Sequence, residues 1–199
     1  MHTPRPLALL ALSLLALLPT AALAHAGHAA AGGLAAGFLH PLGGLDHVLA
    51  MVAVGLLAWN LGGRALWLVP LAFVAAMAAA GAIGMAGTTL PLAELGIGLS
   101  VVAIGGLVAL GLRLPTALAM GIAAVFAIFH GHAHGTEMDP TAFGLAYGAG
   151  FVAATVLLHA TGILAGLGLG RLAAGGGAPS RASGAAIAAL GVLILAGTL

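Results

Sequence analysis

Long apolar runs, separated by short breaks rich in glycine and proline, recur along the chain and constrain its fold more than any other feature. Each run approaches the roughly 20 residues that a helix needs to cross a bilayer. Hydrophobic residues make up 62% of the 199 residues and charged residues only 5%, which is too apolar for a soluble domain. The alternation of a membrane β-barrel is missing. The sequence therefore predicts an all-α, polytopic membrane helical bundle that forms one domain.

Residues 1–24 have the pattern of a cleavable signal peptide, with a basic start, an apolar segment at 7–18 and small residues up to Ala24. The apolar segment would form about 18 Å of helix, which is too short to cross a bilayer. We expect cleavage after Ala24, so that residues 25–199 form a single transmembrane domain beginning at His25. The alternative is an uncleaved anchor.

The glycine and proline breaks predict six transmembrane helices after the signal peptide. They cover approximately residues 41–61, 65–86, 92–112, 115–135, 141–169 and 182–198. If the mature amino terminus lies outside, four arginines fall in cytoplasmic connections, as the positive-inside rule requires, and all four acids fall on the outer side. These residues are Arg64, Arg113, Arg171 and Arg181, and Asp46, Glu94, Glu137 and Asp139. We therefore expect a multi-pass protein of the bacterial cytoplasmic (inner) membrane with both mature termini in the periplasm.

The first cluster of polar residues lies between His40 and His47, which Asp46 directly precedes. The rest of that span has only 14 residues after His47, about 21 Å of helix, so it must recruit residues before this point. Asp46 and His47 therefore lie within the outer edge of the bilayer, where an ionisable pair usually marks a pathway. A continuous helix beginning at Pro41 would place His40 and His47 on one face, with Asp46 as a ligand or as the partner of one. The alternative is a helix cap with an interfacial histidine.

A second polar cluster ends the fourth span and contains His130, His132, His134 and Glu137. His130, His134 and Glu137 follow an i, i+4, i+7 spacing, which places them on one helix face. The carboxyl end of a helix carries partial negative charge, which favours a bound cation. His132 points the opposite way unless the neighbouring glycines unwind the helix. The alternative is a polar helix end that faces the periplasm.

Both clusters lie at a similar depth, so contact between the first and fourth spans would combine them into one site. Imidazole and carboxylate ligands suit divalent ions such as Ni²⁺, Co²⁺ and Zn²⁺. The chain has no cysteine and no lysine, which excludes a thiolate site, a thiolate nucleophile and a P-loop lysine. The net charge of +1 gives no indication of nucleic-acid binding. The sequence therefore predicts a divalent-metal site at the outer mouth of the bundle, in a protein without a prosthetic group.

Three further histidines lie outside these clusters. His25 and His28 would open the mature chain, where the terminal amine and the imidazoles could collect metal ions; the alternative is a solvated tail. His159 lies deeper, in the fifth span, as a second ligand station or as a core residue that hydrogen-bonds a neighbouring helix. The glycines that recur every fourth position over 162–170 predict close helix packing.

Two stretches, HPLGGLDH at 40–47 and FHGHAHGTE at 129–137, resemble the signature of the HupE/UreJ family. The resemblance extends over nearly the whole chain. That family is regarded as nickel permeases associated with the maturation of hydrogenase and urease, whose maturation proteins the resemblance implies as partners. By the same resemblance, the residues that handle nickel are His40, Asp46, His47, His130, His134 and Glu137.

Two other classes of function remain open on the sequence alone. The protein could bind periplasmic nickel, or a chemically similar ion such as cobalt, and hand it to a partner without transporting it. It could also be an intramembrane hydrolase in which Ser100 and His159 form a dyad. Helix geometry argues against the hydrolase, because Ser100 would lie about 12 Å below the outer edge of its span and His159 about 27 Å along its own. We therefore expect a transport or binding protein rather than an enzyme.

Overall fold

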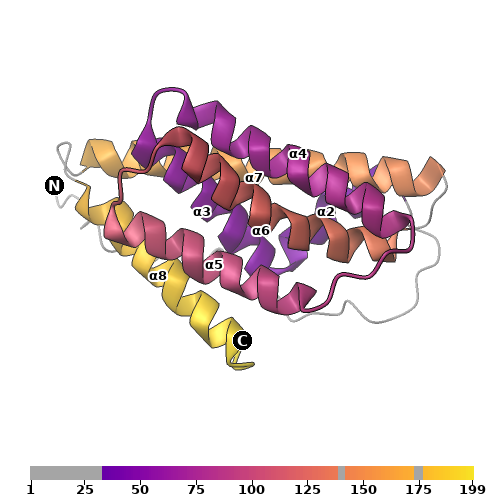
Figure 1. Cartoon of the computed structure of the whole chain (residues 1–199). Coiled ribbons are helices and arrows are strands. Elements are labelled where there is room, and N and C mark those ends of the chain that lie inside the picture. The colour runs from indigo at the N-terminus through magenta and orange to yellow at the C-terminus, as the bar shows by residue number, and fades with distance from the viewer. Residues whose placement is uncertain (1–32, 139–141, 173–176) are drawn as a thin grey trace, which may run out of the picture.

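The computed structural model describes residues 33–138, 142–172 and 177–199, and these form helices and no strand. The helices are α2 (Leu34–Gly43), α3 (Leu45–Leu61), α4 (Ala65–Met85), α5 (Ala93–Leu110), α6 (Thr116–Glu137), α7 (Ala142–Leu172) and α8 (Ala178–Leu195) (Figure 1). The predicted all-α class is confirmed. The expected signal peptide lies outside the described residues, as do His25 and His28.

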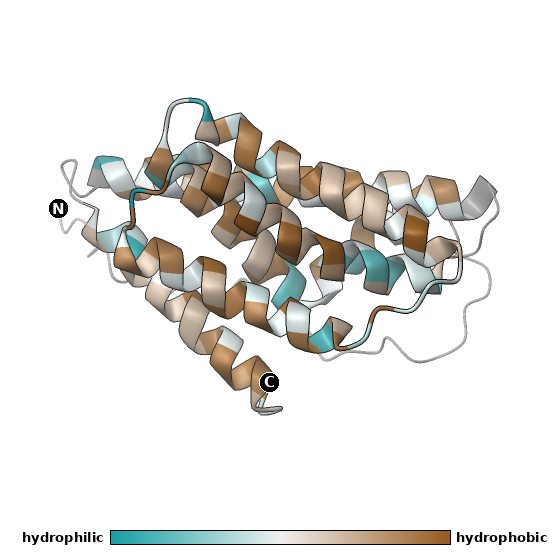
Figure 2. Ribbon diagram, viewed as in Figure 1, coloured by the Kyte–Doolittle hydropathy of each residue, from teal (hydrophilic) through white to brown (hydrophobic). Residues whose placement is uncertain are grey.

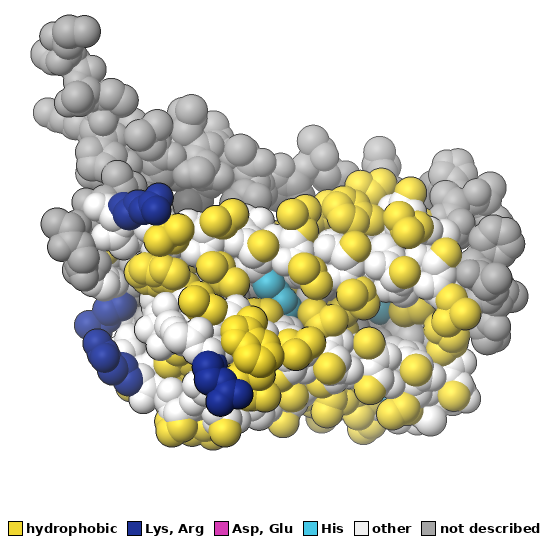
Figure 3. Space-filling model, turned by 90° about the horizontal axis from the view of Figure 1, so that it is seen from above, with side chains coloured by type: hydrophobic (Ala, Val, Ile, Leu, Met, Phe, Trp, Pro, Cys, Tyr) yellow, Lys and Arg dark blue, Asp and Glu magenta, His cyan; other side chains and the backbone are white. Residues whose placement is uncertain are grey.

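Five helices, α4 to α8, are long and apolar enough to cross a membrane, and their bounds match the last five predicted spans closely. Apolar residues prevail along their length, as the hydropathy colouring shows (Figure 2). Leu71 on α4 is 54% exposed and Leu164 on α7 is 64% exposed, and hydrophobic side chains cover the face drawn in Figure 3. Such a surface suits lipid rather than water. The chain is a multi-pass membrane protein.

The first predicted span is broken. α2 and α3 meet at an angle of 87°, and Gly44 between them has an extended backbone with φ −99° and ψ 118°. Pro41 lies inside α2 instead of beginning a helix. The prediction of one continuous helix over 41–61 is therefore wrong. Gly43 and Gly44 have the weakest helix preference after proline, which allows the backbone to leave the helix at Gly44.

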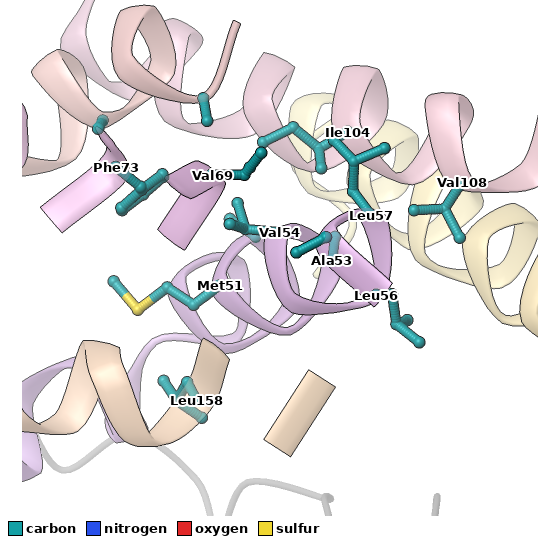
Figure 4. Packing of buried hydrophobic residues seen from close by; sticks show 14 of the residues in the cluster. Met51, Ala53, Val54, Leu56, Leu57, Val69, Phe73, Ile104, Val108 and Leu158 are labelled. Carbon is teal, nitrogen blue, oxygen red and sulfur yellow. The ribbon is translucent and has the colours of Figure 1, made fainter. Parts of the chain in front are cut away.

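α3 is the centre of the bundle, because it contacts every other helix that the structure describes. Met51, Val54 and Leu57 contribute to the core from α3, Phe73 joins them from α4, and Leu158 joins them from α7 (Figure 4). All five side chains are buried. The dense packing around α3 fixes the position of its first turn, which carries Asp46 and His47.

Glycines bring the backbones of α4 and α6 into close contact along their length. A Cβ atom at Gly131 would collide with the carbonyl oxygen of Met77, and one at Gly135 would collide with the carbonyl oxygen of Gly81. α6 continues as a helix to Glu137. The glycines therefore serve helix packing, and the alternative in which they unwind the end of the helix is wrong.

The glycine repeat of α7 allows its backbone to pack closely against α3 in the same way. A Cβ atom at Gly162 would collide with the carbonyl oxygen of Val52, and Gly166 and Gly170 lie against the ring of Trp59. The predicted role of this repeat in close packing is confirmed.

The arginines and acids that the structure describes separate to the two ends of the bundle. The arginines precede α4, follow α5, end α7 and begin α8, and Figure 3 shows the basic side chains toward one end. Asp46, Glu94 and Glu137 occupy the opposite end, in the first turns of α3 and α5 and the last residue of α6. Both polar clusters therefore lie at the acidic end.

Candidate metal site

The two polar clusters meet at the acidic end of the bundle, although 87 residues separate His47 from His134. The ring of His134, on α6, lies with its centroid 4.6 Å from that of His40 and 4.6 Å from that of His47. His130, one turn earlier on α6, lies 4.7 Å from His47 between ring centroids. Three helices thus bring four imidazoles together, as contact between the first and fourth spans would require.

The bend at Gly44 produces this arrangement. His40 and His47 reach the same imidazole, that of His134, from two helices that meet at 87°. The predicted shared face of one continuous helix is wrong, and the two histidines converge because α2 turns away from the axis of α3. A Cβ atom at Gly44 would lie 2.8 Å from Asp46 Oδ1 and 3.0 Å from His47 Nδ1, so the glycine also leaves room for this pair.

Asp46 orients His47. His47 Nδ1 lies 2.7 Å from Asp46 Oδ1, and the backbone N–H of His47 also donates to this oxygen at 2.7 Å. A carboxylate only accepts hydrogen bonds, so the proton of a neutral His47 ring is on Nδ1. The lone pair of Nε2 is then free, which is the usual arrangement of a metal-binding histidine held by a carboxylate.

That free nitrogen points at a second imidazole. His47 Nε2 and His134 Nε2 are 2.5 Å apart, and both side chains are buried. On the far edge of the second ring, His134 Nδ1 lies 3.4 Å from Glu137 Oε2, which is an ion-pair distance without the geometry of a hydrogen bond. The two Nε2 atoms therefore converge on one point, and each ring has an acid beside its Nδ1 atom. Such a point suits a cation.

The outer edge of the cluster is open. His40, His134 and Glu137 can place one ligand atom each within 4.8 Å of one another. His40 and Glu137 are exposed, whereas His134 is buried. An ion could therefore reach His134 from outside through His40 and Glu137.

Comparison with known proteins identifies the family of this chain. A family model described as "HupE / UreJ protein" matches residues 12–194. The chain belongs to the HupE/UreJ family. It is 46% identical over 161 residues to Protein HupE of Rhizobium leguminosarum bv. viciae, covering 81% of this chain and 83% of that protein. No solved structure matches the chain.

In this HupE/UreJ family member, ring contacts continue into the core from the cluster of His40, His47, His130 and His134 at the end of the bundle (the outer cluster). The ring centroid of Phe73 lies 5.6 Å from that of His130 and 5.1 Å from that of His159. His159 is 2% exposed, and neither ring nitrogen has a hydrogen-bond partner among the described residues. The predicted alternative, a hydrogen bond to a neighbouring helix, is therefore not seen in the described part of the chain.

The surroundings of His159 are apolar. A groove of about 290 Å³ between α4 and α7 reaches it, and the lining includes Trp67, Pro70 and Val156. Among the described residues, no acid lines this groove. A cation beside His159 would therefore have one imidazole and no counter-charge in the groove wall.

His132 faces away from the row of rings. Its Nε2 lies 3.0 Å from Thr88 Oγ1, and it lines a second pocket together with Glu94 and Glu137. Because α6 remains helical there, His132 stays on the opposite side from His134. Glu137 belongs to both places, so this pocket adjoins the outer site.

Two further residues contact the histidines, although the sequence did not predict them as parts of a metal site. Phe73 stands between His130 and His159, and Ser100 Oγ lies 2.9 Å from His130 Nε2. One aromatic or one serine inside an apolar run carries no sequence signal of this kind. The structure pairs Ser100 with His130, so the Ser100–His159 dyad of the hydrolase hypothesis is not formed.

Proposed function

We propose that this protein is a nickel (Ni²⁺) permease of the bacterial cytoplasmic membrane that supplies metal for the maturation of hydrogenase or urease. Membership of the HupE/UreJ family supports this proposal, because that family is regarded as nickel permeases with this association. The multi-pass helical bundle supports it as well, since it offers a protein-lined route across the bilayer.

The observation that carries the proposal is the convergence of His47 Nε2 and His134 Nε2 at 2.5 Å. Asp46 holds the proton of His47 on the opposite nitrogen. At this distance one proton links the two rings, with His134 Nε2 donating to the lone pair of His47 Nε2. A divalent ion that displaces this proton would bind both buried nitrogens. His40 and Glu137 complete a set of imidazole and carboxylate ligands at the exposed edge.

These ligands suit a borderline divalent ion. Imidazole binds Ni²⁺ and Co²⁺ well, and a chain without cysteine offers no thiolate to select a softer ion. The ligand set does not separate nickel from cobalt, so nickel rests on the family association.

The direction of transport follows from the charges at the two ends. By the positive-inside rule, the arginines favour a cytoplasmic location for their end of the bundle, and the histidine cluster would then face the periplasm. An ion captured by His134 and His47 would pass His130, then Phe73, and reach His159. A divalent ion that moves into a negative interior gains about 4.6 kcal/mol per 100 mV, twice the value for a unit charge, so no nucleotide is needed.

Uptake of radioactive nickel into liposomes that contain only this protein tests the proposal. We expect uptake that saturates and rises with an inside-negative potential. Liposomes without protein provide the background, and a cobalt competitor measures selectivity. A flat time course with retained nickel binding would contradict transport and favour a non-transporting accessory protein that passes nickel to a partner.

A further inference from the structure

Ser100 is a buried hydroxyl in the middle of an apolar helix, and it makes two contacts. It is 0% exposed on α5. Its Oγ donates to the carbonyl oxygen of Ile97 at 2.6 Å and lies 2.9 Å from His130 Nε2. The proposed permease function does not by itself explain why Ser100 contacts His130.

Counting protons fixes the direction of the second contact. A serine hydroxyl has one hydrogen, and the carbonyl oxygen of Ile97 can only accept it. Ser100 Oγ must therefore accept from His130, so Nε2 carries the ring proton. A neutral imidazole has one N–H, which leaves Nδ1 of His130 as a lone pair. That nitrogen is buried and has no hydrogen-bond partner among the described residues.

We propose that Ser100 is a positioning residue that holds His130 in the tautomer protonated at Nε2 and thereby presents the Nδ1 lone pair to an ion leaving the His47–His134 pair. The use of that lone pair rests on the proposed permease function, whereas the tautomer itself does not. His47, 4.7 Å away between ring centroids, is held by Asp46 in the opposite tautomer. The two neighbouring imidazoles thus carry their lone pairs on different nitrogens. The Asp46 carboxylate leaves the lone pair of His47 on Nε2, and the Ser100 hydroxyl leaves that of His130 on Nδ1.

A hydrolytic serine–histidine dyad would need the reverse hydrogen bond. A nucleophilic serine donates its proton to the imidazole that acts as base. Here the hydroxyl proton is directed at Ile97, and Ser100 has no exposed surface from which to attack a substrate. The geometry therefore favours orientation of His130 over nucleophilic chemistry at Ser100.

Nitrogen NMR of the full chain in lipid nanodiscs, with ¹⁵N-labelled histidine, tests the tautomer directly. The His130 signals are those missing from a His130→Gln variant. We expect a protonated Nε2 and an unprotonated Nδ1 in the unchanged protein. A proton on Nδ1 would overturn the proposal, and this result needs no variant of Ser100 that folds.

Variants of Ser100 then test the consequence. Ser100→Ala should release the tautomer and weaken nickel binding by about ten- to a hundredfold, as loss of a group that orients a ligand does. Ser100→Thr, which keeps the hydroxyl, should preserve the tautomer. Thr155→Val is the matched control, because Thr155 is equally buried and donates to the carbonyl oxygen of its own helix at Phe151.

The outcomes separate this proposal from the permease function. Unchanged tautomer and affinity in Ser100→Ala would overturn the role of Ser100, while uptake by the unchanged protein would keep the permease. Absence of uptake by the unchanged protein would overturn the permease and leave the measured tautomer as it is. Labelling of Ser100 by a fluorophosphonate probe for reactive serines would contradict the orientation of its proton; we expect none.

Discussion

The outer cluster and His159 are two histidine sites in one bundle with opposite surroundings. His47 and His134 each have an acid within 3.4 Å, and their Nε2 atoms converge. His159 is equally buried, has no hydrogen-bond partner among the described residues and lies in an apolar wall. Because an ion without a counter-charge is costly in the membrane, the outer cluster suits capture and His159 suits brief passage.

Removal of either converging imidazole should have the largest effect. We expect His47→Ala and His134→Ala to weaken nickel binding by more than about a hundredfold, since loss of a ligand exceeds the cost of losing a residue that orients one. Equilibrium dialysis with radioactive nickel on the purified protein measures this affinity.

His132→Ala is the control on the same helix. Its side chain is as buried as that of His134 but faces Thr88, so its loss should leave nickel affinity within about twofold. An equal loss of affinity in the His132 and His134 variants would remove the distinction between the two faces of α6.

The carboxylate beside His47 should come next. Asp46→Ala removes the acceptor that holds the proton on Nδ1, and we expect nickel affinity to fall by about ten- to a hundredfold. Asp46→Asn keeps an acceptor oxygen and should lose less. If the alanine variant bound as tightly as the unchanged protein, Asp46 would have no part in orienting His47.

At the inner station, His159→Leu should separate capture from passage. We expect nickel affinity to stay within about twofold while the uptake rate in liposomes falls about tenfold, which is about 1.4 kcal/mol at the barrier. The variant should also unfold less readily, because it removes a buried polar group without a partner. Unchanged uptake would exclude His159 from the pathway, and lost affinity would place it in the capture site.

The bend between α2 and α3 allows the finest test. Gly44→Ala would press a methyl group against Asp46 Oδ1 and His47 Nδ1, and we expect a loss of about fivefold in nickel affinity from a strain of about 1 kcal/mol. Gly43→Ala is its matched control, since a Cβ atom there meets nothing within 4 Å. Equal effects of the two substitutions would show that the local contact with the Asp46–His47 pair is unimportant.

Most of the fold could be predicted from the sequence, because apolar runs of membrane length leave a chain few alternatives. The broken first span could not, since Pro41 favours a helix start on the sequence alone, whereas it lies inside α2 in the structure. Hydropathy does not register the extended backbone at Gly44. Packing of α2 against α7, where a Cβ atom at Gly37 would collide with the carbonyl oxygen of Tyr147, accompanies the bend and depends on contacts that are distant in sequence.

The candidate site also contains residues that the sequence predicts and residues that only the packing of the helices reveals. Helical phase places His134 beside Glu137 and sets His132 apart, because α6 is regular and phase is a local property. The partners Ser100 and Phe73 depend on how α5 and α4 pack against α6. No local pattern marks them, although each touches His130.

X-ray absorption at the nickel edge tests the central claim most directly, because it reports the ligands of the bound ion. With one equivalent of nickel on the purified protein, we expect imidazole nitrogen and oxygen ligands, with one imidazole fewer in His47→Ala and in His134→Ala. Sulfur ligands, or an unchanged spectrum in both variants, would contradict capture of nickel between these two histidines.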